Sequence, residues 1–339
     1  MRQRILVIMM VSIVSILGPG PIPQAHAADA ASSAAPGPVD PQATLKETET
    51  RRRDTLKYGI ESEIFELLDS LKAEKDGSYN EEILGLFKSS RSQKLRSAIL
   101  DFWSALEWKG GEAEAFGLVE GRDNQDPALV SSAVAYLAQI RSTKALSLSK
   151  DLLKEGDKKI LPSLLKLLGR AGGPQEEEAL LAYLDSEDAT EDLKQGAIRA
   201  LGDFGSGKAA DKLMKLVEDP QGSKTTRMVA SESLGKIGDP RAVKSLVIAA
   251  NGDDVNVKAS AVAALGHFKG GEVDKAILGS LRDASVLVRI AGCKALAARK
   301  LDEAVPALVY KANYDPEKAV KTEAIKALGE VGGKDAFAF

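Results

Sequence analysis

The stretch VKASAVAALGHFKGGEVDKAIL, residues 257–278, decides the fold because the chain repeats its pattern many times. A Leu followed by Gly or Ala recurs at spacings of 31, 33, 33, 31, 31 and 32 residues. A nearly fixed period of this length indicates a protein built from stacked structural repeats. The repeated leucines are Leu137, Leu168, Leu201, Leu234, Leu265, Leu296 and Leu328.

Each repeat reads as two short helices. Before the pair, apolar residues such as Val257, Ala261 and Leu265 fall at helical spacing on one face. After the pair comes a turn, and then a second run with apolar residues four positions apart, such as Val273 and Ile277. An acidic turn follows, where a carboxylate can cap the next helix by accepting its backbone N–H bonds. These turn residues are Asp188, Asp219, Asp253, Asp283 and Asp315.

The period therefore predicts an all-α protein, an α-solenoid of about eight or nine helical hairpins running from about residue 51 to the end. One hairpin cannot bury its apolar face alone, so the hairpins must stack on one another. The repeats of residues 51–187 are diverged, and those of 188–339 are regular, with the last hairpin incomplete. Either Phe337 and Phe339 cap the stack, or the chain is a shortened version of a longer one.

The N-terminus predicts export. Residues 1–27 read as a signal peptide, with a basic start, an apolar run from Ile5 to Leu17 and a small-residue cleavage site ending at Ala27. That run is short for a membrane span, which needs about 20 residues, although an uncleaved anchor is the alternative. Residues 28–50, rich in Ala, Ser and Pro, are predicted to be a disordered linker. No membrane span is expected after cleavage, and the destination is the periplasm or the exterior.

The composition disfavours a nucleic-acid partner, an internal disulfide and a catalytic or metal site. Without residues 1–27 the chain has 44 basic and 49 acidic residues, a net charge of −5, which disfavours nucleic acid as the main partner. The single cysteine, Cys293, excludes an internal disulfide and falls on an apolar helix position. His267 is the only histidine after Ala27. We expect no catalytic residue, no metal site and no cofactor.

The segments VASESLGKIGDPRAVKSL (229–246), VRIAGCKALAARKLDEAVPALV (288–309) and VKTEAIKALGEVGGKDA (320–336) resemble HEAT repeats of the short kind first associated with phycobilisome lyases. The resemblance is strongest over residues 188–339. It implies a right-handed superhelix in which the second helix of each pair lines the concave face. It also implies a ladder between repeats, in which the turn Asp residues meet basic residues.

In the five repeats from Leu201 onward, a basic residue precedes the Gly or Ala of the pair by eight positions, and it is the predicted partner of the turn carboxylates. We interpret this column as a structural ladder rather than a site for an acidic partner. Its members are Lys194, Arg227, Lys258, Arg289 and Lys321.

The partner surface should be supplied by residues three, six and ten positions before each Gly or Ala. The candidates are Arg199, Glu232, Asn256, Ser260, Lys294, Glu323 and Lys326. Trp103 and Trp108, the only tryptophans of the chain, are further candidates because aromatic residues often anchor interfaces. The alternative for both is packing inside a diverged early repeat.

These observations predict a non-catalytic scaffold or adaptor that binds a protein or peptide through the concave face of the solenoid. A bilin-lyase-like enzyme subunit and a structural component of the cell envelope are the alternatives. HEAT-like hydroxylases hold two irons with repeated His-Glu pairs, and His267 alone cannot build such a site.

Overall fold

The computed structural model describes residues 41–187 and 189–332, and in these ranges the regular secondary structure is entirely helical. Two compact units divide the chain, Met1–Thr48 and Glu49–Phe339, and the repeats lie in the second. The described residues form eighteen α-helices, which agrees with the predicted eight or nine hairpins. The prediction of an all-α solenoid is confirmed.

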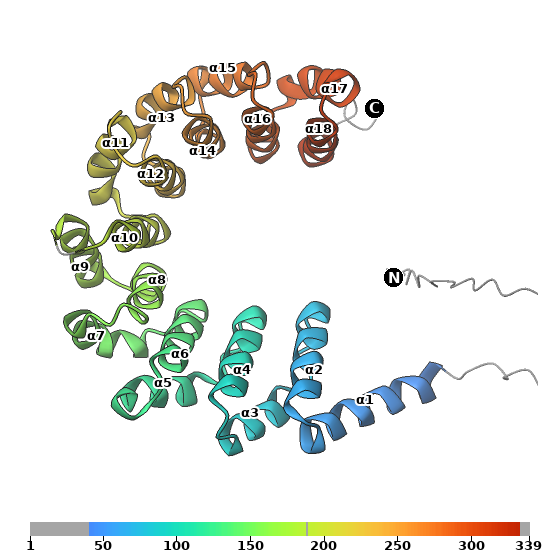
Figure 1. Cartoon of the computed structure of the whole chain (residues 1–339). Helices are drawn as coiled ribbons and strands as arrows, with labels where there is room; N and C mark the ends of the chain where they lie inside the picture. The colour runs from blue at the N-terminus through green and yellow to red at the C-terminus, as the bar shows by residue number, and fades with distance from the viewer. Residues whose placement is uncertain (1–40, 188, 333–339) are drawn as a thin grey trace, which may run out of the picture. The chain divides into compact units, whose positions relative to one another are not determined.

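The helices of the second unit alternate between two layers (Figure 1). The even-numbered helices form the inner layer, on the inner side of this unit's curve, and each one packs against the next. They are α2 (Glu61–Glu74), α4 (Gln93–Leu106), α6 (Pro127–Gln139), α8 (Leu161–Ala171), α10 (Glu191–Phe204), α12 (Lys224–Ile237), α14 (Val255–Leu265), α16 (Val286–Arg299) and α18 (Lys318–Val331).

The outer layer holds the odd-numbered helices that follow α1 (Pro41–Tyr58). They are α3 (Asn80–Ser89), α5 (Glu112–Glu120), α7 (Ser149–Glu155), α9 (Pro174–Asp185), α11 (Ala210–Glu218), α13 (Ala242–Ala250), α15 (Gly271–Ser280) and α17 (Val305–Tyr314).

Hairpins pair each inner helix with the outer helix before it, as α11 with α12 and α17 with α18. The helix that carries the Leu-Gly or Leu-Ala pair is therefore the second helix of its hairpin, and it lies in the inner layer. The last hairpin that the structure describes is α17–α18. The predicted incomplete hairpin depends on residues 333–339, including Phe337 and Phe339, which lie outside the described residues.

The repeated pair is where neighbouring inner helices touch. We number positions in each repeat from the Gly or Ala of the pair, which is position 0. All seven leucines of the pair are buried. A Cβ added to Gly169 would lie 2.6 Å from Cα of Ala200 on the next inner helix, and one on Gly202 would lie 2.9 Å from Cα of Ser233. Gly at position 0 therefore lets the inner helices approach closely.

The predicted linker is wrong for residues 41–50, because α1 begins at Pro41. Proline suits the first turn of a helix, and no further Gly or Pro follows until Gly59. The predicted signal peptide and residues 28–40 lie outside the described residues. None of the helices in the described ranges combines the length and the hydrophobicity that a membrane crossing requires.

Candidate partner-binding surface

The inner layer exposes most of the residues predicted for the partner surface. Position −3 supplies Arg199, Glu232, Lys294 and Lys326, and all four are exposed. Asn256, at position −10, is also exposed, whereas Ser260 and Glu323 at position −6 are half-buried. Position −6 is partly covered because it packs toward the preceding inner helix, as Gly196 does against Leu165.

A second row of side chains escaped the sequence analysis. It occupies position +1, directly after each pair, and includes Gln139, Arg170, Asp203 and Lys236. The Gln139 amide donates to the Glu107 carboxylate at 3.0 Å and accepts from the Arg170 guanidinium. Lys236 Nζ lies 2.7 Å from Asp203 Oδ1. The signal was available, since a polar residue follows most of the pairs.

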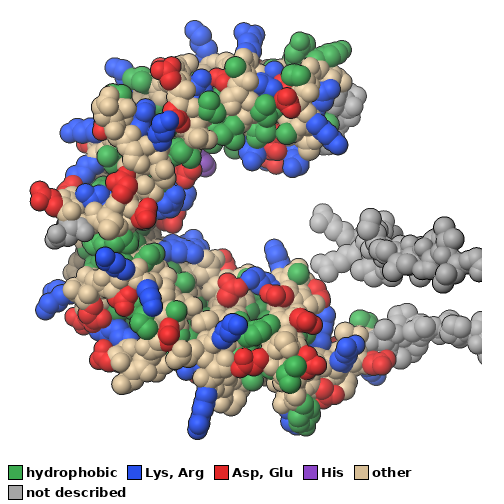
Figure 2. Space-filling view, in the orientation of Figure 1, with side chains coloured by type: hydrophobic (Ala, Val, Ile, Leu, Met, Phe, Trp, Pro, Cys, Tyr) green, Lys and Arg blue, Asp and Glu red, His purple; other side chains and the backbone are tan. Residues whose placement is uncertain are grey.

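The rows at positions −3 and +1 carry mainly positive charge from α8 to α18, although the whole chain has a net charge of −3. Asp203, Glu232 and Glu330 are the carboxylates of these rows. Figure 2 shows basic side chains among acidic and apolar ones on this unit. The surface can therefore attract a partner segment with acidic side chains. The cations of the rows are Lys166, Arg170, Arg199, Lys236, Lys294 and Lys326.

The prediction of a partner contact at Trp103 is wrong, because this side chain is 0% exposed. Its ring lies 5.2 Å from that of Phe87, 5.1 Å from Trp108 and 6.0 Å from Tyr136, measured between centroids. The Tyr136 hydroxyl donates to the carbonyl oxygen of Trp108 at 2.6 Å. Large aromatic side chains fill the core of the early repeats, whereas the core of the regular repeats is mainly aliphatic, built from Ala, Val, Leu and Ile. Trp108 itself is half-buried.

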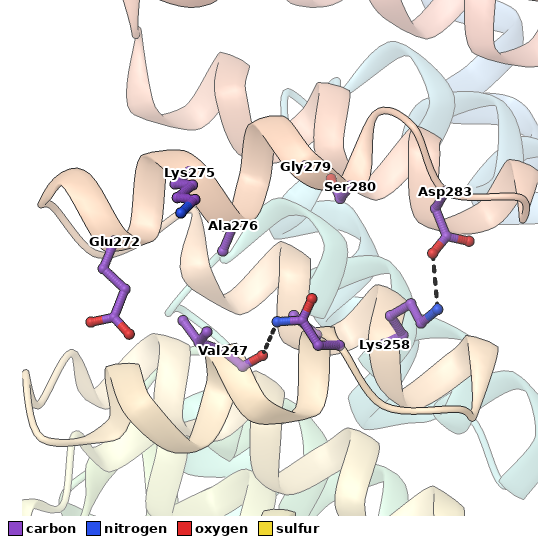
Figure 3. A pocket seen from close by; sticks show the side chains of 10 residues that line it. Val247, Lys258, Glu272, Lys275, Ala276, Gly279, Ser280 and Asp283 are labelled. Atoms are coloured by element: carbon purple, nitrogen blue, oxygen red, sulfur yellow. Dashed lines mark hydrogen bonds and ion pairs between the residues drawn. The ribbon is translucent and has the colours of Figure 1, made fainter.

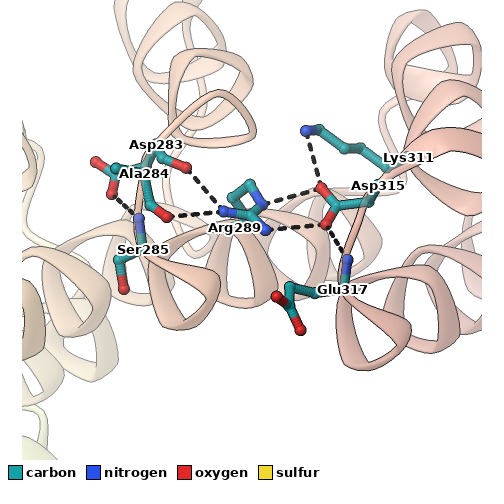
Figure 4. Close-up of polar contacts among 7 residues, drawn as sticks. All are labelled: Asp283, Ala284, Ser285, Arg289, Lys311, Asp315 and Glu317. Carbon is teal, nitrogen blue, oxygen red and sulfur yellow. Dashed lines mark hydrogen bonds and ion pairs between the residues drawn. The ribbon is translucent and has the colours of Figure 1, made fainter.

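Two rungs of the predicted ladder are present. Lys258 Nζ lies 2.9 Å from Asp283 Oδ2, joining α14 to the turn of the next hairpin. Arg289 donates two hydrogen bonds of 2.9 Å to the Asp315 carboxylate, which is buried (Figure 4). Lys311 and the backbone N–H of Glu317 also donate to Asp315.

The electrostatics of Asp315 follow from these contacts. Its burial alone would raise the carboxyl pKa, but the hydrogen bonds from Arg289, Lys311 and the Glu317 backbone outweigh burial and lower the pKa to about 2. A hydrogen-bonded, charge-paired carboxylate in a closed site makes this rung a structural element.

The other predicted rungs are replaced by different contacts. Arg227 donates to the carbonyl oxygen of Val217 at 3.1 Å. Lys321 donates to the carbonyl oxygen of Asn313 at 3.0 Å. Lys194 is half-buried, and Asp188 lies outside the described residues.

The turns explain the missing rungs. Asp283 and Asp315 stand two residues before the N-caps Ser285 and Glu317. The N-cap of α14 is Asp254, so the residue two positions before it is Gly252. Asp253 lies one position too late to take the place of Asp283 or Asp315. Asp254 caps the helix and pairs with Lys224 instead, at 2.8 Å. Before α12 the corresponding residue is Gln221, and Asp219 accepts its backbone N–H.

A family model described as spirochaete HEAT repeat protein matches residues 56–339. The chain belongs to this family. Among curated proteins, none matches this HEAT repeat protein. The resemblance to the phycobilisome-lyase kind of repeat stays a prediction.

Several solved structures are similar to this HEAT repeat protein. An engineered protein shares 19% identity at a TM-score of 0.45, over 85% of this chain and 90% of its own. Human deoxyhypusine hydroxylase in complex with glycerol shares 16% identity at a TM-score of 0.35, over 86% and 98%. Kap121p shares 12% identity at a TM-score of 0.45, over 84% of this chain and 37% of its own.

The outer layer of this HEAT repeat protein holds a cleft between α13 and α15, with a volume of about 510 Å³ (Figure 3). Small residues on both helices leave the space, including Ala250, Ala276 and Gly279. Lys258 and Asp283 close one end with their ion pair. No group of three or more His, Cys, Asp or Glu side chains could hold a metal ion here or elsewhere in the described ranges.

The two residues considered for chemistry lie where the sequence indicated. Cys293 is 0% exposed on α16. Burial, followed by the charge of Glu323, raises the pKa of its thiol to about 12. His267 is exposed at position +1, just after α14. A buried, protonated thiol is a poor nucleophile.

Proposed function

We propose that this HEAT repeat protein is a non-catalytic scaffold or adaptor that binds a segment of another protein along its inner layer. The observation that carries the proposal is the row of exposed side chains at position −3. Arg199, Lys294 and Lys326 occupy equivalent places on three inner helices and are all exposed. A HEAT-repeat solenoid presents such equivalent side chains in a row, which suits an elongated partner.

The chemistry of the row indicates an acidic partner segment. Electrostatic attraction between a basic surface and an acidic segment speeds association and selects against basic partners. Apolar side chains on the same layer, Val255 at 40% exposure and Leu287 at 45%, offer contacts for the uncharged side chains of that segment. We further propose that the protein works in the periplasm or outside the cell, on the strength of the predicted signal peptide.

The experiment compares two matched triple variants in affinity capture from the native envelope fraction. Arg199→Ala, Lys294→Ala and Lys326→Ala together remove three inner-layer cations. Lys215→Ala, Lys244→Ala and Lys275→Ala together remove three exposed cations of the outer layer and keep the net charge equal. A partner that the inner variant loses and the outer variant retains supports the proposal. Equal retention by both variants would rule out the inner cations as the binding surface.

A further inference from the structure

Each inner helix of the regular repeats has one side that receives the next inner helix. The residue at position 0 packs against the residue at position −2 of the next inner helix, as Gly169 does against Ala200. Position −4 lies under position −6 of the next helix, as Leu165 lies under Gly196. Position −4 is consequently 0% exposed in four successive helices, at Ile198, Ser231, Val262 and Cys293.

On α18 the same side is uncovered. Ile325 at position −4 is 53% exposed. A Cβ added to Gly329 at position 0 would have no neighbour within 4 Å among the described residues. Thr322, one turn earlier on this side, is also exposed. This tail face, formed by Thr322, Ile325 and Gly329, has the small and apolar residues that receive an inner helix in the other repeats.

The complementary side is uncovered on α2, the first inner-layer helix of the described residues. Leu71 is 0% exposed and takes the place of the leucine of the pair, so Lys72 stands at position 0. Positions −2 and −6, which pack backward in the other repeats, are then Ser70 and Glu66, and both are exposed. We call this the head face; it is formed by Glu66 and Ser70. Ser70, at position −2, is small, as is the residue that packs against Gly169 at position 0 in the regular repeats.

A carboxylate also stands at position −6 elsewhere in this chain. Glu323 of α18 holds that place relative to Cys293 of α16, and its charge contributes to the raised pKa of the thiol. The stem of Glu66 can cover Ile325, with its carboxylate at the rim.

The charges on the two helices are mainly opposite, although Glu330 is also exposed on α18. Lys318 and Lys326 are exposed on α18. Glu61 and Glu63 are exposed at the start of α2.

We propose that the tail face of one molecule docks on the head face of a second copy, so that copies join head to tail through their inner layers. The contact is heterologous because the two faces differ. Each molecule has one head face and one tail face. Successive copies would continue the row of inner-layer cations from one molecule into the next, which increases the avidity for a long or repetitive partner.

The test measures the mass of the purified protein by sedimentation from low to several hundred micromolar concentration. Gly329→Leu blocks the tail face at a site where an added Cβ meets none of the described residues within 4 Å. The double variant Glu66→Lys and Ser70→Lys places two positive charges on the head face, where they would repel Lys318 and Lys326 of the second copy. Gly117→Leu, also in open space but on α5, is the matched control, and circular dichroism establishes that each variant folds.

The wild type and the control should self-associate as concentration rises, and each face variant should weaken association at least tenfold. Mixing the two face variants should give a one-to-one dimer and nothing larger, because one intact head meets one intact tail. A monomeric wild type, face variants that associate normally or a mixture without dimers would overturn the proposal. Association that appears only after removal of residues 333–339 would also overturn it, since that segment would then be the occupant of the tail face.

Discussion

Replacing Gly169 with Ala should destabilise the protein, whereas the same replacement of Gly329 should stabilise it. Both residues stand at position 0 of an inner helix, so their intrinsic helix propensities change alike, by about 1 kcal/mol in favour of Ala. The Gly169 methyl group would lie 2.5 Å from the oxygen and 2.6 Å from Cα of Ala200. These are backbone atoms, so α8 and α10 must move apart, at a cost of about 1–3 kcal/mol for overpacking.

The propensity gain offsets part of that cost, so Gly169→Ala should lower the free energy of unfolding by up to about 2 kcal/mol. Gly329→Ala meets no atom of residues 41–187 or 189–332 within 4 Å and should raise the free energy of unfolding by up to about 1 kcal/mol. Urea unfolding, followed by far-ultraviolet circular dichroism at low protein concentration, gives both midpoints. A Gly169→Ala protein that is stabilised as much as the Gly329→Ala protein would refute the close approach of the inner helices.

Three further changes test other parts of the structure. The depressed pKa of Asp315 contributes stability above its unfolded pKa of 3.8 that is lost as the pH falls to about 2, about 2 kcal/mol. The urea-midpoint difference between wild type and Asp315→Asn should therefore shrink over that range, and a constant difference would argue against the Arg289 pair. Trp103→Phe should lower the unfolding free energy by about 1–3 kcal/mol without changing partner capture, and loss of capture in a folded variant would restore Trp103 as a contact. Cys293 should react with iodoacetamide at pH 8 far more slowly in the native protein than in urea, because its thiol is buried, and equal rates would place it at the surface.

The fold was predictable because its cause is local and repeated. The leucine of the pair, such as Leu265, is buried in each regular repeat, so the same packing demand recurs at a fixed period. The sequence did not reveal which neighbouring helix completes each hairpin. Apolar spacing marks the buried face of a helix but does not say whether the preceding or the following helix covers it.

The details of the polar sites were less predictable. A shift of one or two residues in a turn decides whether a carboxylate meets the neighbouring repeat, as Asp315 does, or caps its own helix, as Asp254 does. The column of basic residues was visible, but the register of the turns was not. Trp103 was misread because composition cannot distinguish an aromatic contact surface from an aromatic core.

The exposure of the candidate residues was predicted in part. Helical periodicity placed Arg199, Lys294 and Lys326 on an exposed face, and they are exposed. The row that includes Arg170 and Lys236 was missed because the residue after the pair was taken to belong to the turn. In the structure, both residues still lie in their inner helices.

The central proposal is that the inner layer binds the partner, and amine-reactive cross-linking in the native envelope fraction tests it most directly. Lys294 and Lys326 report on the inner layer, while Lys215, Lys244 and Lys275 report on the outer layer, and all five are exposed. Mass spectrometry should find one dominant partner cross-linked through Lys294 or Lys326. Cross-links to a partner only through the three outer-layer lysines would contradict the account.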